Sequence, residues 1–224
     1  PGGSAVAGRR RRARHAILDP MSHENPSQKA PTTAEEWDER YGTANLWSGE
    51  PNQTLTTVVA DLVPGTVLDV GCGEGADAVW LARHGWSVTA LDLSRVAVER
   101  GRARADAAGL AITWLVQGFG EAETGKFDLV SVQYPAIPRG GDEHVEEALE
   151  RAVAPGGRLL FVHHDMDEAP HGYDTQDYVM PQHVLAHVAG RGWEIERDEV
   201  RERHVPGGAG AGHSRDRVVL ARKV

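Results

Sequence analysis

The chain has one cysteine, few aromatic residues and no long hydrophobic run. A single cysteine, Cys72, cannot form an internal disulfide bond, so the sequence favours a reducing compartment and we expect a cytoplasmic protein. No apolar stretch approaches the roughly 18 residues that a membrane-spanning helix needs, so we expect no membrane partner. The other residues, 40% hydrophobic and 25% charged, have the ordinary composition of a folded protein, and 224 residues suit one α/β domain.

Positive charge is scarce outside the first residues. The formal net charge is −9, and residues 1–20, with five arginines and one aspartate, contribute +4, which leaves −13 for the rest. Because phosphate binding needs clustered cations, we expect no nucleic-acid partner. Residues 1–32 are rich in Gly, Pro, Ser and Arg and show no periodicity. We predict a disordered basic N-terminal extension over residues 1–32 and one domain over residues 33–224.

From Thr33 the sequence alternates between helix and strand patterns. Thr33 and Glu36 have the spacing of a capping box, and a second amphipathic helix follows at Leu55–Leu62. The later patterns predict strands at Thr66–Val70, Ser87–Leu91, Ile112–Val116, Phe127–Val132, Arg158–Val162, Trp193–Val205 and Arg217–Val224, and helices at Ala76–His84, Ser94–Gly109, Val145–Val153 and Pro181–Ala189. This alternation predicts a doubly wound α/β fold: a mostly parallel, seven-stranded sheet with helices on both faces and a C-terminal antiparallel hairpin strand.

A glycine-rich turn joins the first predicted strand to the next helix. In Gly71-Cys72-Gly73-Glu74-Gly75, the missing Cβ atoms let the backbone turn sharply and let a ligand lie directly on it. The helix that follows offers free N–H groups at its start. The same turn also fits the dinucleotide pattern GxGxx(G/A), so an NAD(P)-dependent oxidoreductase is the natural alternative.

Two carboxylates favour a different ligand. Asp69 stands two residues before Gly71, where it would repel a pyrophosphate but can accept hydrogen bonds from an ammonium group or from loop amides. Asp92 ends the second strand about 20 residues later, where it can accept both hydroxyls of an adenosine ribose; its alternative role is to cap the helix after Ser94. Cys72 is interpreted as a small residue in a tight loop, with a nucleophilic role as the alternative.

Several segments carry a family resemblance. Leu68–Gly75 and Ala90–Ser94 resemble the first two signature motifs of class I (Rossmann-like) S-adenosylmethionine-dependent methyltransferases, and Phe127–Val130 and Leu149–Leu160 resemble later ones. Trp37–Tyr41 with Trp47–Asn52 is similar to the tellurite-resistance and thiopurine-type branch. The resemblance covers residues 33–224. It implies an enzyme that transfers a methyl group from S-adenosylmethionine to a small molecule, at an O, N, S or chalcogen atom, and releases S-adenosylhomocysteine. A non-catalytic cofactor-binding protein stays open as a further alternative.

The resemblance also implies contacts with the cofactor. Around the methionine part, it assigns Asp69, Gly71, Cys72 and Gly73 to the loop, with Tyr41 and Trp47 closing over the sulfonium. It places the ribose on Asp92 and the adenine against Leu93. Many relatives have an acidic residue after the third strand, where this chain has Gln117-Gly118-Phe119, so the amide oxygen of Gln117 is expected to replace it. Gln133, at the end of the fourth strand, completes the cofactor-binding set.

Candidate catalytic residues follow the fourth and fifth strands, since reacting groups gather at the carboxyl ends of a parallel sheet. Tyr134, His164 and Asp165 are these candidates, with His164 as a general base and packing or substrate shaping as the alternative. Neighbouring strand residues point to opposite faces, so His163 and His164 cannot share one metal ion without a bend, and we predict no metal. Further polar residues near this mouth are Arg139, Asp167, Glu168, His171, Tyr173, Asp174 and His213, beside a Gly207–Gly212 hairpin tip. These acidic and histidine side chains favour a cationic or amine acceptor. We expect a monomer or a homodimer.

Overall fold

The computed structural model describes residues 30–42, 46–120, 124–140, 142–165, 177–203 and 214–224. Within these ranges the helices are α1 (Ala34–Gly42), α2 (Gln53–Val59), α3 (Ala76–Arg83), α4 (Arg95–Ala107), α5 (His144–Ala152) and α6 (Pro181–Val188). The strands are β1 (Thr66–Val70), β2 (Ser87–Asp92), β3 (Thr113–Val116), β4 (Phe127–Gln133), β5 (Val153–His164), β6 (Trp193–Glu202) and β7 (Arg215–Lys223).

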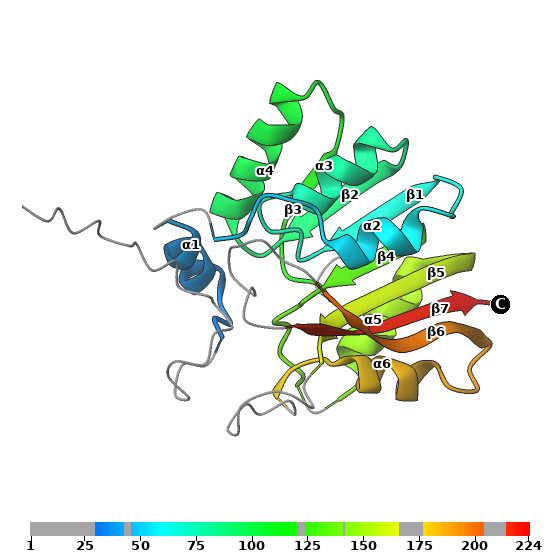
Figure 1. Ribbon diagram of the computed structural model, residues 1–224. Coiled ribbons are helices and arrows are strands. Elements are labelled where there is room, and N and C mark those ends of the chain that lie inside the picture. Colours follow the sequence, from blue (N-terminus) through cyan, green and yellow to red (C-terminus); the bar gives the residue numbers. More distant parts are fainter. Residues whose placement is uncertain (1–29, 43–45, 121–123, 141, 166–176, 204–213) are drawn as a thin grey trace, which may run out of the picture.

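One seven-stranded sheet organises the described residues, in the order β3-β2-β1-β4-β5-β7-β6 (Figure 1). The strands from β1 to β5 are parallel, and β7 runs antiparallel to both β5 and β6. The expected doubly wound fold with a C-terminal antiparallel strand is therefore confirmed. Because strand order reverses between β1 and β4, a crevice for ligands is expected beyond the carboxyl ends of these two strands. In Figure 1, α1 lies beyond that edge of the sheet.

Helices cover both faces of the sheet. Strand residues point alternately to one face and the other, so a buried strand packs against helices on both sides. Leu160 and Val162 of β5 pack with α2 and α3 in one buried hydrophobic cluster, whereas Leu159 and Phe161 pack with α5 and α6 in another. The strands that carry these residues are nearly continuously apolar, as expected for strands buried on both sides. The central strands β1 and β4 are thus held firmly, and the loops at their carboxyl ends start from fixed positions.

The N-terminal capping box is confirmed. The backbone N–H of Glu36 donates to Thr33 Oγ1 at 3.2 Å, and the backbone N–H of Thr33 donates to Glu36 Oε2 at 3.1 Å. Just before it, the N–H of Ala30 donates to Tyr178 Oη at 3.1 Å. The expected extension falls largely on residues 1–29, which lie outside the described ranges, so the boundary at residue 33 stays a prediction.

Strand β5 corrects the sequence prediction. The segment Pro155-Gly156-Gly157 was expected to separate a helix from a strand that begins at Arg158, but β5 already begins at Val153. Val153 pairs with Phe127 of β4, and the register then shifts before Leu129 pairs with Arg158. The prolyl and glycyl residues therefore form an irregularity within a strand, because pairing with β4 resumes after them.

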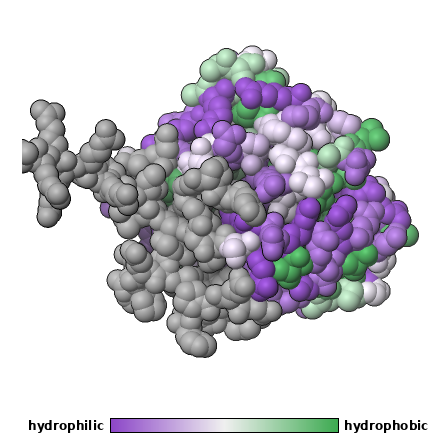
Figure 2. Space-filling view, viewed as in Figure 1, coloured by the Kyte–Doolittle hydropathy of each residue, from purple (hydrophilic) through white to green (hydrophobic). Residues whose placement is uncertain are grey.

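The β6 edge of the sheet is strongly charged. Nearly every side chain of β6 is exposed or half-buried, and Ile195 and Val200 are 41% exposed. Figure 2 shows that hydrophilic residues cover much of this face of the molecule, with hydrophobic ones scattered among them. Charged side chains on an edge strand oppose pairing with a further strand. Among the described residues, no helix combines the length and the hydropathy that crossing a membrane requires.

The far edge of the Trp114 ring connects β3 to the glycine-rich turn. A Cβ atom at Gly101 of α4 would lie 2.6 Å from Trp114 Cη2, and so would a Cβ atom at Gly75. We therefore predict that Gly101→Ala lowers the free energy of unfolding by about 1–3 kcal/mol, the usual cost of overpacking. Chemical denaturation measures this loss.

A double-mutant cycle tests the cause. Trp114→Phe removes the ring edge that Gly101→Ala would meet, so the same alanine should cost clearly less in that background. An equal loss in both backgrounds would show that the contact with Trp114 is not responsible.

Candidate active site

A cavity of about 400 Å³ lies at the carboxyl ends of the parallel strands. All the residues that the sequence assigned to the cofactor line it, namely Tyr41, Trp47, Asp69, Gly71, Cys72, Gly73, Asp92, Leu93, Gln117, Gly118, Phe119 and Gln133. Of the catalytic candidates, Tyr134 and His164 also line it. Asp165 does not line the cavity. Its carboxylate pairs with Arg215 at 2.6 Å.

The glycine-rich turn has a conformation that side chains disfavour. Gly71, Gly73 and Gly75 have φ values of 70°, 51° and 76°, the left-handed region that glycine adopts at little cost. The N–H groups of Gly71 and Cys72 both donate to Leu91 O at 2.9 Å, which fixes the turn to β2. A Cβ atom at Gly71 would meet nothing within 4 Å, so the space over this residue is open to a ligand.

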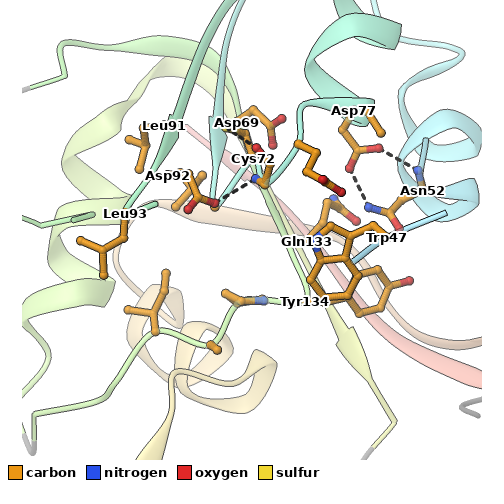
Figure 3. Close-up of a pocket in the computed structure, with 18 of the residues that line it drawn as sticks. Trp47, Asn52, Asp69, Cys72, Asp77, Leu91, Asp92, Leu93, Gln133 and Tyr134 are labelled. Atoms are coloured by element: carbon orange, nitrogen blue, oxygen red, sulfur yellow. Dashed lines mark hydrogen bonds between the residues drawn. The ribbon is translucent and has the colours of Figure 1, made fainter. Parts of the chain in front are cut away.

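Asp92 holds the turn from the second strand. Its Oδ2 accepts from the N–H of Gly73 at 2.9 Å (Figure 3), and its Oδ1 accepts from the N–H of Ser94 at 2.8 Å. Ser94 itself is the N-cap of α4, because its Oγ accepts from the N–H of Ala97. Burial raises the pKa of Asp92, although the two amide hydrogen bonds oppose the shift. The helix is therefore capped by Ser94, and the Asp92 carboxylate faces the pocket.

Three carboxylates surround the turn: Asp69, Asp77 and Asp92 (Figure 3). Burial raises the pKa of Asp69 well above its ordinary value, and the neighbouring charges of Asp77 and Asp92 raise it further. Asp69 is only 2% exposed and its Oδ2 has no hydrogen-bond partner in the described residues. A buried carboxylate oxygen without a partner is costly, so this site favours a cationic or hydrogen-bond-donating ligand.

Asn52 binds Asp77 through two donors. Its backbone N–H donates to Oδ1 and its Nδ2 donates to Oδ2, both at 2.7 Å. Burial raises the pKa of Asp77, and these bonds from Asn52 oppose it. The pair ties the segment before α2 to the first turn of α3. Sequence reasoning missed Asp77, because an aspartate in the first turn of a helix needs no other explanation.

Aromatic side chains close one end of the pocket. Trp47 Nε1 donates to Tyr41 Oη at 2.9 Å, and both side chains lie against Gly73. Burial raises the pKa of Tyr41 well above its ordinary value, so its phenol stays protonated. Burial likewise raises the pKa of Cys72, so its thiol stays protonated and is a poor nucleophile.

A second polar cluster lines the same cavity. Asp216 Oδ2 accepts from Tyr134 Oη at 2.6 Å and from Thr54 Oγ1 at 3.1 Å. His164 Nδ1 lies 2.9 Å from an Arg203 guanidinium nitrogen, and the two rings of Tyr134 and His164 are 4.6 Å apart. Burial raises the pKa of Tyr134 well above its ordinary value, and the Asp216 charge adds to the shift, so Tyr134 acts as a donor.

The comparisons with known proteins fit this geometry. Residues 67–157, which span the turn, match the family described as "Methyltransferase domain". The chain is 34% identical over 116 residues to "Ribosomal RNA small subunit methyltransferase C" of Chromohalobacter salexigens, which covers 49% of this chain and 34% of that protein. It is 26% identical over 161 residues to "Ubiquinone biosynthesis O-methyltransferase" of Pectobacterium carotovorum, and the alignment covers 63% of this chain and 64% of that protein. It thus spans less than two thirds of either relative.

Solved structures share the fold. One, described as "Conversion of a Disulfide Bond into a Thioacetal Group during Echinomycin Biosynthesis", aligns with a TM-score of 0.68 and 25% identity, over 85% of this chain and 92% of that one. The chain contains a methyltransferase domain, matched over residues 67–157. The expected family and its cofactor, S-adenosylmethionine, are confirmed. TehB from Haemophilus influenzae aligns with a TM-score of 0.63 over 85% of this chain and 67% of that one, but at 18% identity. That likeness shows the fold alone, so the narrower tellurite-resistance branch stays a prediction.

The cavity also contains residues that sequence reasoning missed. Thr54, Asp216 and Arg203 all line the cavity, yet none stands near a recognisable motif. Conversely, Arg139, which was expected at the mouth, pairs with the buried Glu146 at 2.8 Å. His163 is buried and does not line the cavity, as expected from the opposite orientation of neighbouring strand residues. The other expected mouth residues lie outside the described ranges, namely Asp167, Glu168, His171, Tyr173, Asp174, Gly207–Gly212 and His213.

Proposed function

We propose that this protein transfers a methyl group from S-adenosylmethionine to a small-molecule acceptor. The observation that carries the proposal is the buried Asp69 carboxylate, whose Oδ2 has no hydrogen-bond partner among the described residues. The open space over Gly71 lies beside it in the same turn. An aminoacyl sulfonium nucleoside brings an ammonium group, a cationic sulfur and two ribose hydroxyls, which suit this arrangement of acceptors.

The same acidic environment opposes the NAD(P)-dependent alternative. A pyrophosphate on this turn would lie among Asp69, Asp77 and Asp92, and like charges at short range in a buried site repel strongly. A non-catalytic binding protein would need the same cofactor contacts, so transfer itself separates it from an enzyme.

The residues of the chain have defined tasks in the proposed reaction. When bound, the cofactor supplies a methyl group on a positively charged sulfur, so the acceptor displaces a neutral thioether. Asp92 holds the ribose, the turn holds the aminoacyl part, and Tyr41 with Trp47 excludes water on one side. Good alignment of two reactants in a dry pocket contributes roughly 7–11 kcal/mol. The chain therefore contributes chiefly orientation, with His164 as the candidate base for a protonated acceptor.

A small molecule is the proposed acceptor, as in the ubiquinone-pathway O-methyltransferase named above. One relative is a ribosomal RNA methyltransferase, but the body of this chain carries a strongly negative charge, which opposes RNA binding. A cytoplasmic location and a monomeric or homodimeric state belong to the same proposal. Incubation with labelled cofactor and either total RNA or a small-molecule extract separates the two acceptor classes.

Calorimetric titration tests the cofactor. We expect S-adenosylhomocysteine to bind with a nanomolar to micromolar dissociation constant, and NADH not to bind. Binding of NADH with no binding of S-adenosylhomocysteine would overturn the proposal. Transfer of a labelled methyl group to any small acceptor then distinguishes an enzyme from a binding protein, and cofactor binding without transfer to any acceptor class would favour the latter.

A further inference from the structure

Arg203 places a buried positive charge at the acceptor side of the pocket. The residue directly follows β6, and its backbone N–H donates to Ser214 O at 2.8 Å, which fixes it beside the start of β7. Its side chain is only 8% exposed and lines the cavity. The guanidinium carbon lies 4.8 Å from the centre of the Tyr134 ring. A stacked, buried guanidinium has a fixed orientation, as a recognition residue requires.

Toward the described residues, most of its hydrogen-bonding capacity is unused. A guanidinium has five N–H donors, and among the described residues the side chain makes one hydrogen bond, from an Nη to His164 Nδ1 at 2.9 Å. Because a guanidinium only donates, Nδ1 of His164 is the acceptor. Arg203 Nε lies 3.7 Å from Asp216 Oδ1, which is beyond hydrogen-bond distance.

Asp216 does not occupy the remaining donors of the Arg203 guanidinium. Its Oδ2 is engaged by the hydroxyls of Tyr134 and Thr54, and its Oδ1 has no hydrogen bond in the described residues. The ion pair with Arg203 is therefore loose, and the guanidinium can still bind a second oxyanion. Tyr134 is also held in place by its backbone, whose φ of 49° is unusual for a residue with a side chain and marks a strained functional position.

The pocket is lined by charges of both signs. Asp69, Asp77 and Asp92 surround the glycine-rich turn, where the cationic cofactor is proposed to bind, whereas Arg203 contacts Tyr134 and His164. The segment Pro135–Pro138 adds mostly apolar lining. A weakly hydrated, planar guanidinium in such surroundings matches a carboxylate or an ionised hydroxyl through paired hydrogen bonds.

We propose that Arg203 binds an anionic oxygen of the methyl acceptor, so that this domain acts on acidic organic molecules. The inference rests on the proposed function and narrows it. It departs from the cationic acceptor that the acidic residues near the mouth suggested, because Asp165 pairs with Arg215 and Asp216 with two hydroxyls, while the other acids expected there lie outside the described residues.

Matched probe pairs test the subsite in the presence of saturating S-adenosylhomocysteine. The carboxylate arm compares 4-hydroxybenzoate with 4-hydroxybenzamide, and the phenolate arm compares 4-nitrophenol with nitrobenzene at pH 8. We expect the anion of at least one pair to bind about tenfold or more tightly than its neutral partner, and the arm with the larger ratio identifies the oxyanion. Arg203→Gln should abolish that ratio and change the affinity for S-adenosylhomocysteine less than twofold.

Two further variants serve as controls. Arg203→Lys retains the positive charge but not the planar pair of N–H donors, so it should keep part of the preference for the anionic probe. Arg217→Gln removes an arginine of β7 that pairs with Asp198 at the surface, and it should leave the preference unchanged. Equal affinity for anion and neutral partner in both arms, including no measurable binding of either, overturns the Arg203 subsite, as does a preference that survives in Arg203→Gln. Wild-type protein that fails to bind S-adenosylhomocysteine refutes the proposed function instead.

Discussion

Replacement of Asp92 by alanine should weaken the binding of S-adenosylhomocysteine by about 10- to 150-fold. The carboxylate already accepts from the amides of Gly73 and Ser94, and its remaining lone pairs are proposed to accept from the ribose hydroxyls. Hydrogen bonds to a charged group contribute about 1.5–3 kcal/mol, which corresponds to that range. Calorimetric titration of purified wild type and variant measures the loss.

A comparison of ligands separates the two roles of Asp92. If the carboxylate grips the ribose, wild type should prefer S-adenosylhomocysteine to its 2′-deoxy analogue, and Asp92→Ala should lose this preference. If it only holds the turn, both ligands should lose affinity equally, which would contradict the ribose assignment. Glu99→Ala, an exposed carboxylate on α4, is the matched control and should bind like wild type.

Asp69→Asn should make the protein without cofactor more stable at pH 7–8 and yet bind the cofactor about tenfold or more weakly. Burial and the nearby carboxylates raise the pKa of Asp69 in the folded state. Between the ordinary value of about 3.9 and that raised pKa, the folded protein binds more protons than the unfolded chain. The free energy of unfolding therefore falls as pH rises through this window. Asparagine removes this loss, but it also removes the charge that faces the cationic part of the ligand.

Thermal unfolding from pH 4 to pH 8 checks the sign. The stability advantage of Asp69→Asn should shrink toward pH 4, where protons begin to bind the carboxyl in the unfolded chain as well. Asp128→Asn is a control of opposite sign, since hydrogen bonds from the amide and hydroxyl of Thr66 lower the pKa of Asp128. Relative to wild type, that variant should be the less stable of the two, by a deficit that grows as pH rises through about 3.9 and then levels off. A variant at Asp69 that is less stable than wild type at pH 8 would contradict the account of its burial.

The cofactor half of the pocket was predictable because its determinants are local. Gly71, Gly73 and Gly75 lie in one turn, and Asp92 follows one strand later, so spacing alone brought them together. Alternation of apolar strands with amphipathic helices likewise predicted a mostly parallel sheet with helices on both faces. The exact course of β5 escaped prediction, because only pairing with β4 carries a strand through Pro155-Gly156-Gly157.

The acceptor half was not predictable in the same way. Tyr134 and Asp216 are 82 positions apart, and only the insertion of β7 beside β5 brings them into contact. Arg203, directly after β6, and Asp216, on β7, are each one of many charged residues in this region, and nothing in their spacing marks them. Asp165 was predicted because it follows two histidines, yet its position after β5 directs it to Arg215 and away from the cavity.

The position of β7 between β5 and β6 has a consequence for the order in which the pocket forms during protein synthesis. The ribosome releases the turn and Asp92 well before Asp216, and domains generally begin to fold from their N-terminal part as they emerge. The cofactor half consists of contacts between neighbouring elements, whereas the acceptor half waits for a strand near the end of the chain to enter between two others. A nascent chain stalled before residue 214 would thus present the nucleoside-binding turn without Asp216. Chains of this kind, compared with full-length protein for capture on immobilised S-adenosylhomocysteine, would reveal whether one half matures before the other.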